Sequence, residues 1–387
     1  MNTPIRSAIE ALPASRIREV ANAGLGRDDV LPFWFGESDE VTPQVVRDAA
    51  VASLQRGETF YSHNLGLVEL REAIAAYASG LHGPIGADRI AVTSSGVSAL
   101  MVAMQMLAGP GDEVVAVVPV WPNLTAQPAI LGAKVLRMAL QPDTDGAWRL
   151  DLDALLAAVT PATRVLLVNA PNNPTGWTLS PAEQRAILAD CRRTGTWIVA
   201  DEVYERVWFG EGCCAPSFLD VAAPDDRLVV AHSFSKSFLM TGWRLGWMVL
   251  PALQLDAAGK LLEFNSSCSP VFVQRGALAA LAMADDFVPD LVARLQTCRD
   301  RLHDGLARLP GVVAARPRGG LYAWLRIEGE VDSLALAKRL VREHGLGLAP
   351  GVAFGPEGEG WLRWCFASRD PARLDAGLTR LAQALCT

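Results

Sequence analysis

The 387-residue sequence is poor in the features that build metal sites, disulfide frameworks or membrane spans. Its 7 cysteines are scattered without a CxxC pair and its 5 histidines show no HxxxH spacing, so we predict neither a metal ion nor disulfide bonds. The apolar run over 277–284 is far shorter than the ~20 residues that a membrane span needs. Glu10 interrupts the apolar stretch that a signal peptide requires, which favours a cytoplasmic protein.

Positive charge is also in deficit. Lys and Arg total 35 against 42 for Asp and Glu, a formal net charge of −7, so nucleic acid is not an expected partner. With 50% hydrophobic and 20% charged residues, the chain has the composition of a compact globular protein without a membrane partner. At about 150 residues per domain, the length predicts two domains.

Four short apolar runs predict strands that are buried on both faces of a parallel sheet. They cover residues 113–118, 164–168, 197–200 and 228–231. Amphipathic stretches lie between them, and the alternation predicts an α/β fold with a large, doubly wound, mostly parallel sheet domain. Ligands bind at the carboxyl ends of such strands. The residues that fall there are Trp121, Asn169, Asp201 and Ser233.

The last part of the chain predicts a smaller α+β domain. Its expected elements are a helical segment over about 274–308, a strand over 321–327, a helix over 332–344 and a strand over 361–367. We therefore predict a large domain over 46–275 and a small domain over 276–387, which also includes the N-terminal segment 1–45.

Lys236 follows a buried strand and stands among small hydroxyl residues. A buried lysine in such a place can form a Schiff base with a carbonyl cofactor and act as a base, because burial lowers its pKa. Ser233, Ser235 and the guanidinium of Arg244 are the groups that a phosphate clamp needs. For an isolated lysine, a surface position at a helix start is the alternative.

Other segments carry the same ambiguity. The serine-rich turn at Ser95, Gly96 and Val97 precedes a helix, whose N-terminus suits a phosphate, although serine also serves there as a simple cap. Asp201 either pairs with a protonated ring nitrogen or caps the next helix. Arg363 interrupts an apolar strand, as a solvent-facing residue or as a fork for a carboxylate.

Ten segments together resemble the class I/II aminotransferases of the pyridoxal-phosphate fold-type I superfamily, in order and over nearly the whole chain. They are FGESDEVTP (35–43), YSHNLGLVELREAI (61–74), SSGVSAL (94–100), PGDEV (110–114), PVWPNL (119–124), NAPNNPTG (169–176), ADEVYE (200–205), SFSKSFLMTGWRLGW (233–247), LAPGVAFG (348–355) and LRWCFA (362–367).

The resemblance implies a role for each matching position. Lys236 would hold pyridoxal phosphate as a Schiff base and shuttle a proton, and Asp201 would keep the ring nitrogen protonated. Tyr204 and Asn173 would bond the ring's phenolic oxygen, and Trp121 would stack on the ring. The phosphate would be bound by Ser95, Gly96, Val97, Ser233, Ser235, Arg244 and, from a partner subunit, Tyr61, which implies a homodimer with shared sites. Arg363, helped by Asn173, would bind the substrate's α-carboxylate beside Gly36.

The resemblance also implies an activity, the transfer of an amino group from an amino acid to a 2-oxo acid. Some aspartate-specific relatives carry a lysine where this chain has Val97, and Trp34, Phe35 and Trp121 add apolar surface, so we expect a neutral or aromatic amino acid as substrate. The alternative with the same cofactor is a carbon–sulfur β-lyase or a related elimination enzyme. A transcriptional regulator is disfavoured, because no basic DNA-binding helix precedes the matching segments.

Overall fold

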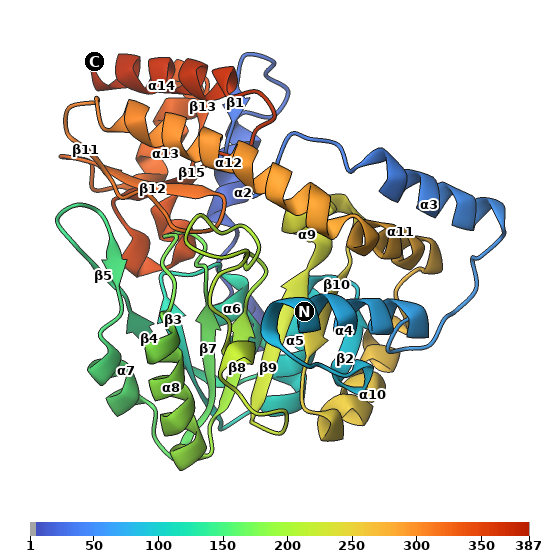
Figure 1. The fold of residues 1–387 in the computed structure, drawn as a ribbon. Helices are drawn as coiled ribbons and strands as arrows, with labels where there is room; N and C mark the ends of the chain where they lie inside the picture. The colour runs from blue at the N-terminus through green and yellow to red at the C-terminus, as the bar shows by residue number, and fades with distance from the viewer. Residues whose placement is uncertain (1–4, 387) are drawn as a thin grey trace.

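The computed structural model describes residues 5–386, which fold around two sheets (Figure 1). The larger sheet has seven strands in the order β2-β10-β9-β8-β7-β3-β4. Only β10 runs antiparallel to its neighbours, so the predicted mostly parallel α/β fold is confirmed. The strands are β2 (Ile90–Thr93), β3 (Glu113–Val118), β4 (Lys134–Ala139), β7 (Thr163–Asn169), β8 (Trp197–Asp201), β9 (Leu228–Ser233) and β10 (Gly246–Val249).

Helices cover both faces of this sheet, as a doubly wound fold requires (Figure 1). The helices of this part of the chain are α3 (Gln44–Gln55), α4 (Val68–His82), α5 (Gly96–Leu107), α6 (Asn123–Ile130), α7 (Leu152–Ala158), α8 (Pro181–Thr194), the short α9 (Phe234–Ser237), α10 (Leu255–Ser266) and α11 (Val271–Ala282), of which α3 packs on α11. Helix α8 begins with a capping box, in which Ser180 and Glu183 bond each other's backbone N–H groups. None of the helices in the described range combines the length and hydrophobicity that crossing a bilayer needs.

The smaller sheet is antiparallel, in the order β11-β12-β15-β14, and lies above the carboxyl ends of the large sheet in the view of Figure 1. Its strands are β11 (Val312–Ala314), β12 (Tyr322–Ile327), β14 (Ala349–Pro350) and β15 (Trp361–Cys365). The helices around it are α2 (Arg16–Ala23), α12 (Ala284–Leu306), α13 (Ser333–His344) and α14 (Ala372–Leu385), whereas α1 (Ser7–Glu10) packs against α6. Strands β5 (Gln141–Pro142) and β6 (Trp148–Arg149) pair with each other in a separate, two-stranded antiparallel sheet.

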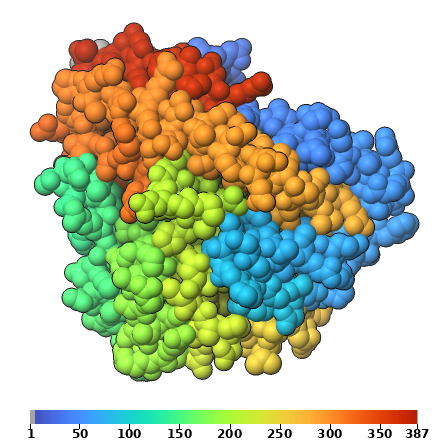
Figure 2. Space-filling view, in the orientation of Figure 1, coloured from blue at the N-terminus to red at the C-terminus, as the bar shows by residue number. Residues whose placement is uncertain are grey.

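The N-terminal segment pairs with the C-terminal part of the chain. Strand β1 (Leu31–Pro32) runs parallel to β13 (Leu346–Gly347), which favours the predicted assignment of 1–45 to the small domain. The space-filling view shows orange and red residues over green and yellow ones (Figure 2). The boundaries near 45 and 275 stay a prediction, and residues 1–4 and 387 of those ranges lie outside the described chain.

The prediction of one helix over about 274–308 is wrong. The chain leaves the helical conformation at Met283 (φ −105°, ψ 7°), so α11 and α12 are separate. Asp285 and Asp286 occupy the first turn of α12, where acidic side chains interact favourably with the helix dipole. A continuous apolar pattern concealed this boundary.

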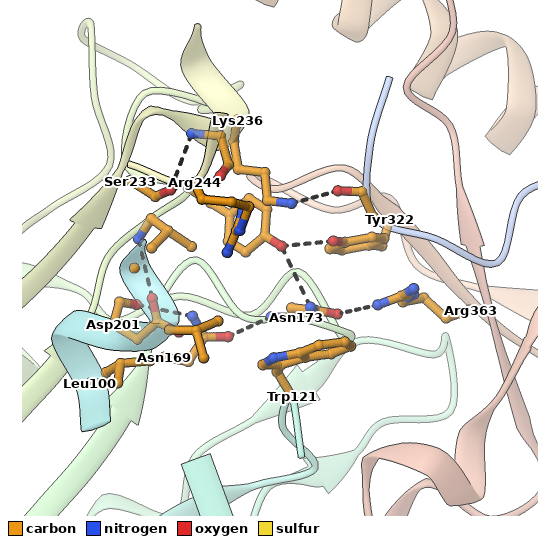
Figure 3. A pocket seen from close by; sticks show the side chains of 16 residues that line it. Leu100, Trp121, Asn169, Asn173, Asp201, Ser233, Lys236, Arg244, Tyr322 and Arg363 are labelled. Carbon is orange, nitrogen blue, oxygen red and sulfur yellow. Dashed lines mark hydrogen bonds between the residues drawn. The ribbon is translucent and has the colours of Figure 1, made fainter. Parts of the chain in front are cut away.

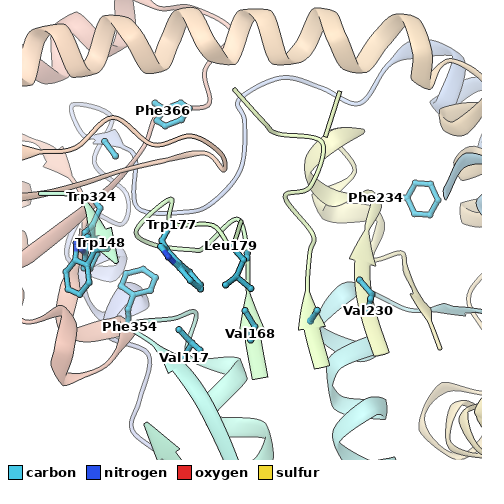
Figure 4. Close-up of a cluster of buried hydrophobic side chains, with 14 of the residues drawn as sticks. Val117, Trp148, Val168, Trp177, Leu179, Val230, Phe234, Trp324, Phe354 and Phe366 are labelled. Atoms are coloured by element: carbon cyan, nitrogen blue, oxygen red, sulfur yellow. The ribbon is translucent and has the colours of Figure 1, made fainter. Parts of the chain in front are cut away.

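The core is continuous between the two sheets. Val117, Val168 and Val230 of the large sheet belong to one cluster with Trp324 and Phe354 of the small domain (Figure 4). Burial of apolar surface contributes ~25 cal/mol per Å² to stability, so these shared apolar contacts hold the large and small domains in one arrangement. The space that they leave at the carboxyl ends of the strands is therefore well defined.

Candidate active site

A cavity of about 220 Å³ lies at the carboxyl ends of β7, β8 and β9, between the two sheets (Figure 3). Thirteen of the predicted residues line it: Gly36, Gly96, Val97, Trp121, Asn169, Asn173, Asp201, Tyr204, Ser233, Ser235, Lys236, Arg244 and Arg363. In the view of Figure 3, Asp201 and Ser233 lie on one side and Arg363 on the other, with Lys236 above and Trp121 below. The remaining lining residues are Leu100, Val203 and Tyr322.

Lys236 projects from the short helix α9, directly after β9. Its Nζ donates to the Gly36 carbonyl at 2.5 Å and lies 5.8 Å from the centre of the Tyr204 ring. Burial lowers the pKa of Lys236 from its ordinary 10.5 to about 8, with a further lowering from Arg363. The lowered pKa gives the amine a minor but far larger neutral fraction near physiological pH than an ordinary lysine has, and the neutral form is the one that attacks a carbonyl.

Asp201 ends β8 and is 4% exposed. Burial raises the pKa of its carboxyl from 3.8 to about 7, although the Val203 N–H, 3.4 Å from Oδ1, and the charge of Lys236 act in the opposite direction. Within residues 5–386 this carboxyl forms no salt bridge. A buried carboxylate of this kind is satisfied by a ligand that brings a positively charged N–H group.

The N-terminus of α5 forms a concave backbone surface. Ser95 caps the helix by accepting the Ser98 N–H at 2.9 Å, so the amides of Gly96 and Val97 lie in the open first turn. Strand β10 passes very close by, because a Cβ at Gly246 would lie 2.6 Å from the Gly96 nitrogen. A helix N-terminus and free amides suit a phosphate.

Polar side chains from the next two segments complete this end of the cavity. Ser233 Oγ donates to Ser235 Oγ at 2.9 Å, and both side chains are buried. Arg244 is exposed, donates to the Thr241 carbonyl at 2.7 Å and forms no salt bridge with any described residue. Its charge is therefore available to an anionic ligand.

Arg363 lies at the opposite end and is 1% exposed. Its Nη1 donates to Asn173 Oδ1 at 2.9 Å, Nη2 donates to the Trp34 carbonyl, and Nε has no partner among the described residues. Asn173 is held in turn by Asn169, whose Oδ1 accepts the Asn173 N–H at 2.7 Å. A buried guanidinium with unused donors and no acidic partner suits a carboxylate ligand.

A buried charge network anchors the loop that carries Asp201 and Tyr204. Glu205 pairs with His82 at 3.0 Å and with His232 at 3.4 Å. Although burial opposes it, hydrogen bonds to Asp220 and Glu205 raise the pKa of His82 to about 10. One possible metal-ligand atom from each of Glu202, Glu205 and His232 lies within 4.8 Å of the other two. These side chains are already paired with other protein groups, so we assign no metal ion to them.

Three predicted positions behave differently. Ser95 acts through its backbone and cap at the edge of the cavity. Tyr61 is 88% exposed and does not line the cavity of its own chain. The prediction that Trp34 adds apolar surface for a substrate is wrong. Trp34 is 7% exposed and its ring packs on Gly24 and Gly347, so only its carbonyl reaches the site.

Sequence reasoning missed Tyr322 and the positioning role of Asn169. Asn169 ends a buried strand in an Asn-rich turn, a signal that also fits ordinary turn chemistry. Tyr322 lies on β12, two residues before Trp324 and on the same face of the strand. Trp324 pairs with Arg363 in the β12–β15 register, and this pairing brings Tyr322 next to Arg363. Nothing in the local sequence of β12 distinguishes it from a core residue.

The residues present fit pyridoxal phosphate. The amide cradle and Arg244 suit its phosphate, and the unpaired buried carboxyl of Asp201 suits its ring nitrogen. An amine with a lowered pKa stands between them. The doubly wound sheet and this arrangement of groups define a fold-type I pyridoxal-phosphate enzyme.

The chain belongs to the family aminotransferase class I and II, whose model matches residues 29–381. It is 32% identical to an aspartate aminotransferase from Musicola paradisiaca, over 86% of this chain and 83% of that protein. It is also 32% identical to an arginine–pyruvate transaminase from Pseudomonas aeruginosa, over 87% of this chain and 85% of that protein. The crystal structure of an aspartate aminotransferase from Thermotoga maritima matches with a TM-score of 0.89 at 30% identity, covering 99% of this chain and 100% of that one.

The protein is therefore a pyridoxal-phosphate-dependent aminotransferase, and its substrates are an amino acid and a 2-oxo acid. This confirms the predicted family, cofactor and reaction. The comparisons do not favour the elimination reaction that the sequence left as an alternative.

Proposed function

We propose that the cavity is the active site of a homodimeric transaminase and that Lys236 is its catalytic base. We also propose that the protein is cytoplasmic, and this cellular location rests on the sequence alone. The observation that supports this most is the placement of the Lys236 amine between Asp201 and Arg363 with its pKa lowered to about 8. Bound pyridoxal phosphate supplies an electron-withdrawing ring that acidifies the substrate's α-hydrogen. Lys236 Nζ would take that proton in its neutral form, which the lowered pKa makes accessible near neutral pH.

The other residues of the cavity divide between cofactor and substrate. Asp201 holds the proton of the ring nitrogen, since a buried carboxylate needs a cation. Tyr204 and Asn173 line the cavity where they would hold the ring oxygen, and Trp121 would provide the surface against which the ring packs. The phosphate is bound by Ser95, Gly96, Val97, Ser233, Ser235 and Arg244. Arg363 binds the α-carboxylate, and Gly36 leaves room beside it.

The test of this assignment is Lys236→Ala. The variant is expected to lose all measurable transfer and the visible absorption of lysine-bound cofactor, while retaining the fold because alanine fits a helical position. Arg244→Ala serves as the comparison, since it is expected to weaken cofactor affinity and to leave that absorption intact at saturating cofactor. A Lys236→Ala protein that still turns over would contradict the assignment.

We propose a neutral or aromatic amino acid as the donor substrate. A second cavity of about 940 Å³ adjoins the first at Gly36, Trp121 and Arg363, and extends beneath α1, α2 and α6. Phe35, which is 39% exposed, contributes to its wall. Val97, which is 37% exposed on the first turn of α5, lines the smaller cavity and offers no charge to a side-chain carboxylate.

One arginine competes with this choice. Arg16 and Arg137 of the larger cavity are paired with Glu19 and Glu357, whereas Arg18 lies 5.9 Å from the Phe35 ring without a salt bridge to any described residue. We therefore expect kcat/KM for phenylalanine or leucine to exceed that for aspartate in the wild type. An aspartate preference that disappears in Arg18→Gln would assign side-chain recognition to Arg18 and overturn the neutral class.

The homodimer is supported by exposed apolar side chains. Phe60, Tyr61 and Phe264 are 84%, 88% and 88% exposed. Their segments lie side by side, because the Ser62 N–H contacts Cys268 Sγ at 3.3 Å and Asn64 Nδ2 donates to the Gly259 carbonyl at 2.9 Å. An apolar cluster of this size on the surface is typical of an interface.

A hybrid test addresses the shared site. Lys236→Ala carries an intact Tyr61, and Tyr61→Phe carries an intact Lys236. If Tyr61 serves the partner's phosphate, co-produced mixed dimers regain one complete site and with it wild-type cofactor affinity at that site. Mixed dimers that bind the cofactor no better than Tyr61→Phe alone would show that the sites are not shared through Tyr61.

A further inference from the structure

Tyr322 joins the two ends of the site, and no role has been assigned to it above. It is 1% exposed and lines the cavity from β12. Its hydroxyl lies 2.7 Å from the hydroxyl of Tyr204, and the centre of its ring lies 4.3 Å from Cζ of the Arg363 guanidinium (Figure 3). One side chain thus touches a group that faces the cofactor and a group that faces the substrate.

The hydroxyl contact determines where the Tyr204 proton points. A phenol oxygen has one proton to donate and lone pairs to accept. The Tyr204 oxygen is approached by Asn173 Nδ2 at 3.5 Å and by the Tyr322 hydroxyl at 2.7 Å. When both donate to it, the Tyr204 proton has no partner among the described residues and is free to face the cavity.

Both phenols keep their protons in this environment. Burial raises the pKa of Tyr322 to about 12 and raises the pKa of Tyr204 well above 10. Either hydroxyl can then be the donor, and with Tyr322 donating the pair forms a chain from Tyr322 to Tyr204, in which each hydrogen bond polarises the next. A polarised Tyr204 hydroxyl is a stronger donor to a negatively charged oxygen.

The ring contact has its own geometric support. A Cβ at Gly36 would lie 2.0 Å from the Tyr322 hydroxyl, so the absence of a side chain at 36 creates the space that Tyr322 fills. On its other side the ring lies against Arg363, which also stacks on Phe354 at 4.8 Å. The two rings restrict the guanidinium plane, and a fixed plane favours bidentate carboxylate binding.

We propose that Tyr322 is a positioning residue with two separable roles, which rest on the function proposed above: its hydroxyl directs the proton of Tyr204 toward the ring oxygen of bound pyridoxal phosphate, and its ring orients Arg363 for the substrate's α-carboxylate. Removing the hydroxyl alone is then expected to change the titration of the bound cofactor. Removing the ring as well is expected to change substrate affinity.

The first experiment is a pH titration of the visible absorption in Tyr322→Phe holoenzyme. In the loaded enzyme the titrating proton would be held at Lys236 Nζ, close to the ring oxygen. A weaker donor would stabilise the negative charge of that oxygen less, so Lys236 Nζ would keep the proton to higher pH. The midpoint is expected to rise by about 0.5 to 1 pH unit, the size that one hydrogen bond produces. Tyr77→Phe is the control, because Tyr77 is half-buried and its hydroxyl accepts a hydrogen bond from Arg206, outside the site.

A double-mutant cycle tests the route through Tyr204. Tyr322→Phe is expected to leave the midpoint unchanged in a Tyr204→Phe background, since the hydroxyl on which it acts is gone. An unchanged midpoint in the single variant, or an equal rise in both backgrounds, would overturn the hydroxyl role. A Tyr77→Phe midpoint that rises as much would show a nonspecific effect and would also overturn it.

Steady-state kinetics separate the ring from the hydroxyl. Tyr322→Leu is expected to raise KM for the amino acid about tenfold or more, through a misoriented Arg363, whereas Tyr322→Phe leaves KM within about twofold. Equal KM values in the two variants would overturn the ring role. The function proposed for Lys236 fails separately, by persistence of the visible band in Lys236→Ala, whatever the Tyr322 variants do.

Discussion

Asp201→Asn is the substitution whose effects follow most directly from the structure. The two side chains have nearly the same shape, so the end of β8 and the Val203 contact at 3.4 Å are expected to persist. The amide cannot carry a negative charge. The variant therefore removes the partner of the ring-nitrogen proton and little else.

The magnitude follows from burial of the carboxyl. Raising its pKa from 3.8 to about 7 corresponds to ~4 kcal/mol of unfavourable charge burial. A cation at the ring nitrogen would offset this cost of burying the Asp201 charge. We take the same free energy as the amount by which Asp201 would stabilise the protonated ring during turnover. Loss of ~4 kcal/mol at the transition state predicts a fall in kcat of about 10³-fold, with KM changed much less.

A stability assay provides an independent measure of the same charge. Because the folded-state pKa of Asp201 is raised, the carboxyl reduces the stability of the cofactor-free protein as pH rises from about 4 through 7. Between pH 5 and pH 7 the unfolding free energy of the wild type is expected to fall by about 2 to 3 kcal/mol relative to Asp201→Asn. Bound cofactor should reduce that difference. Equal kcat values, or a difference in stability that does not vary with pH, would refute this reasoning.

Three further expectations concern Lys236, Arg363 and Gly36. Because only the neutral amine attacks a carbonyl, the rate at which cofactor-free protein rebinds pyridoxal phosphate should increase with pH, with the midpoint of the increase near pH 8. A midpoint near 10.5 would contradict the effect of burial on the pKa of Lys236. Arg363→Lys keeps the charge and loses the fork, so KM for the amino acid should rise about 10- to 100-fold in steady-state assays, and an unchanged KM would exclude bidentate binding. Gly36→Ala should lower the thermal unfolding midpoint and the substrate affinity, because its Cβ would collide with Tyr322. Gly80→Ala, in open space on α4, should instead stabilise the protein by ~1 kcal/mol. Equal shifts of the midpoint in the two variants would contradict the close packing of Gly36 against Tyr322.

Much of the fold could be predicted, because buried parallel strands leave a strong pattern. The run 113–118 coincides with β3, and the run 228–231 lies within β9. Where such a strand ends, the next polar residue enters the cavity, as Asp201 and Ser233 do. These positions follow from short-range sequence and the geometry of the sheet.

The remaining features depend on contacts between distant segments. Tyr322 reaches the site through the register of β12 against β15, which residue patterns do not encode. Trp34 was expected to face a substrate, but small residues at Gly24 and Gly347 make room for its ring in the core. The end of α11 at Met283 was hidden because both helices present apolar faces without an intervening turn motif.

The central claim, that Lys236 and the cavity around it exchange amino groups, is tested most directly by a visible absorption titration of the purified holoenzyme. Phenylalanine, leucine and aspartate are added in turn, followed by a 2-oxo acid. The account predicts that the band of lysine-bound cofactor disappears with a neutral or aromatic amino acid and returns with the 2-oxo acid, without release of ammonia. A band that persists while ammonia and a 2-oxo acid accumulate would contradict it.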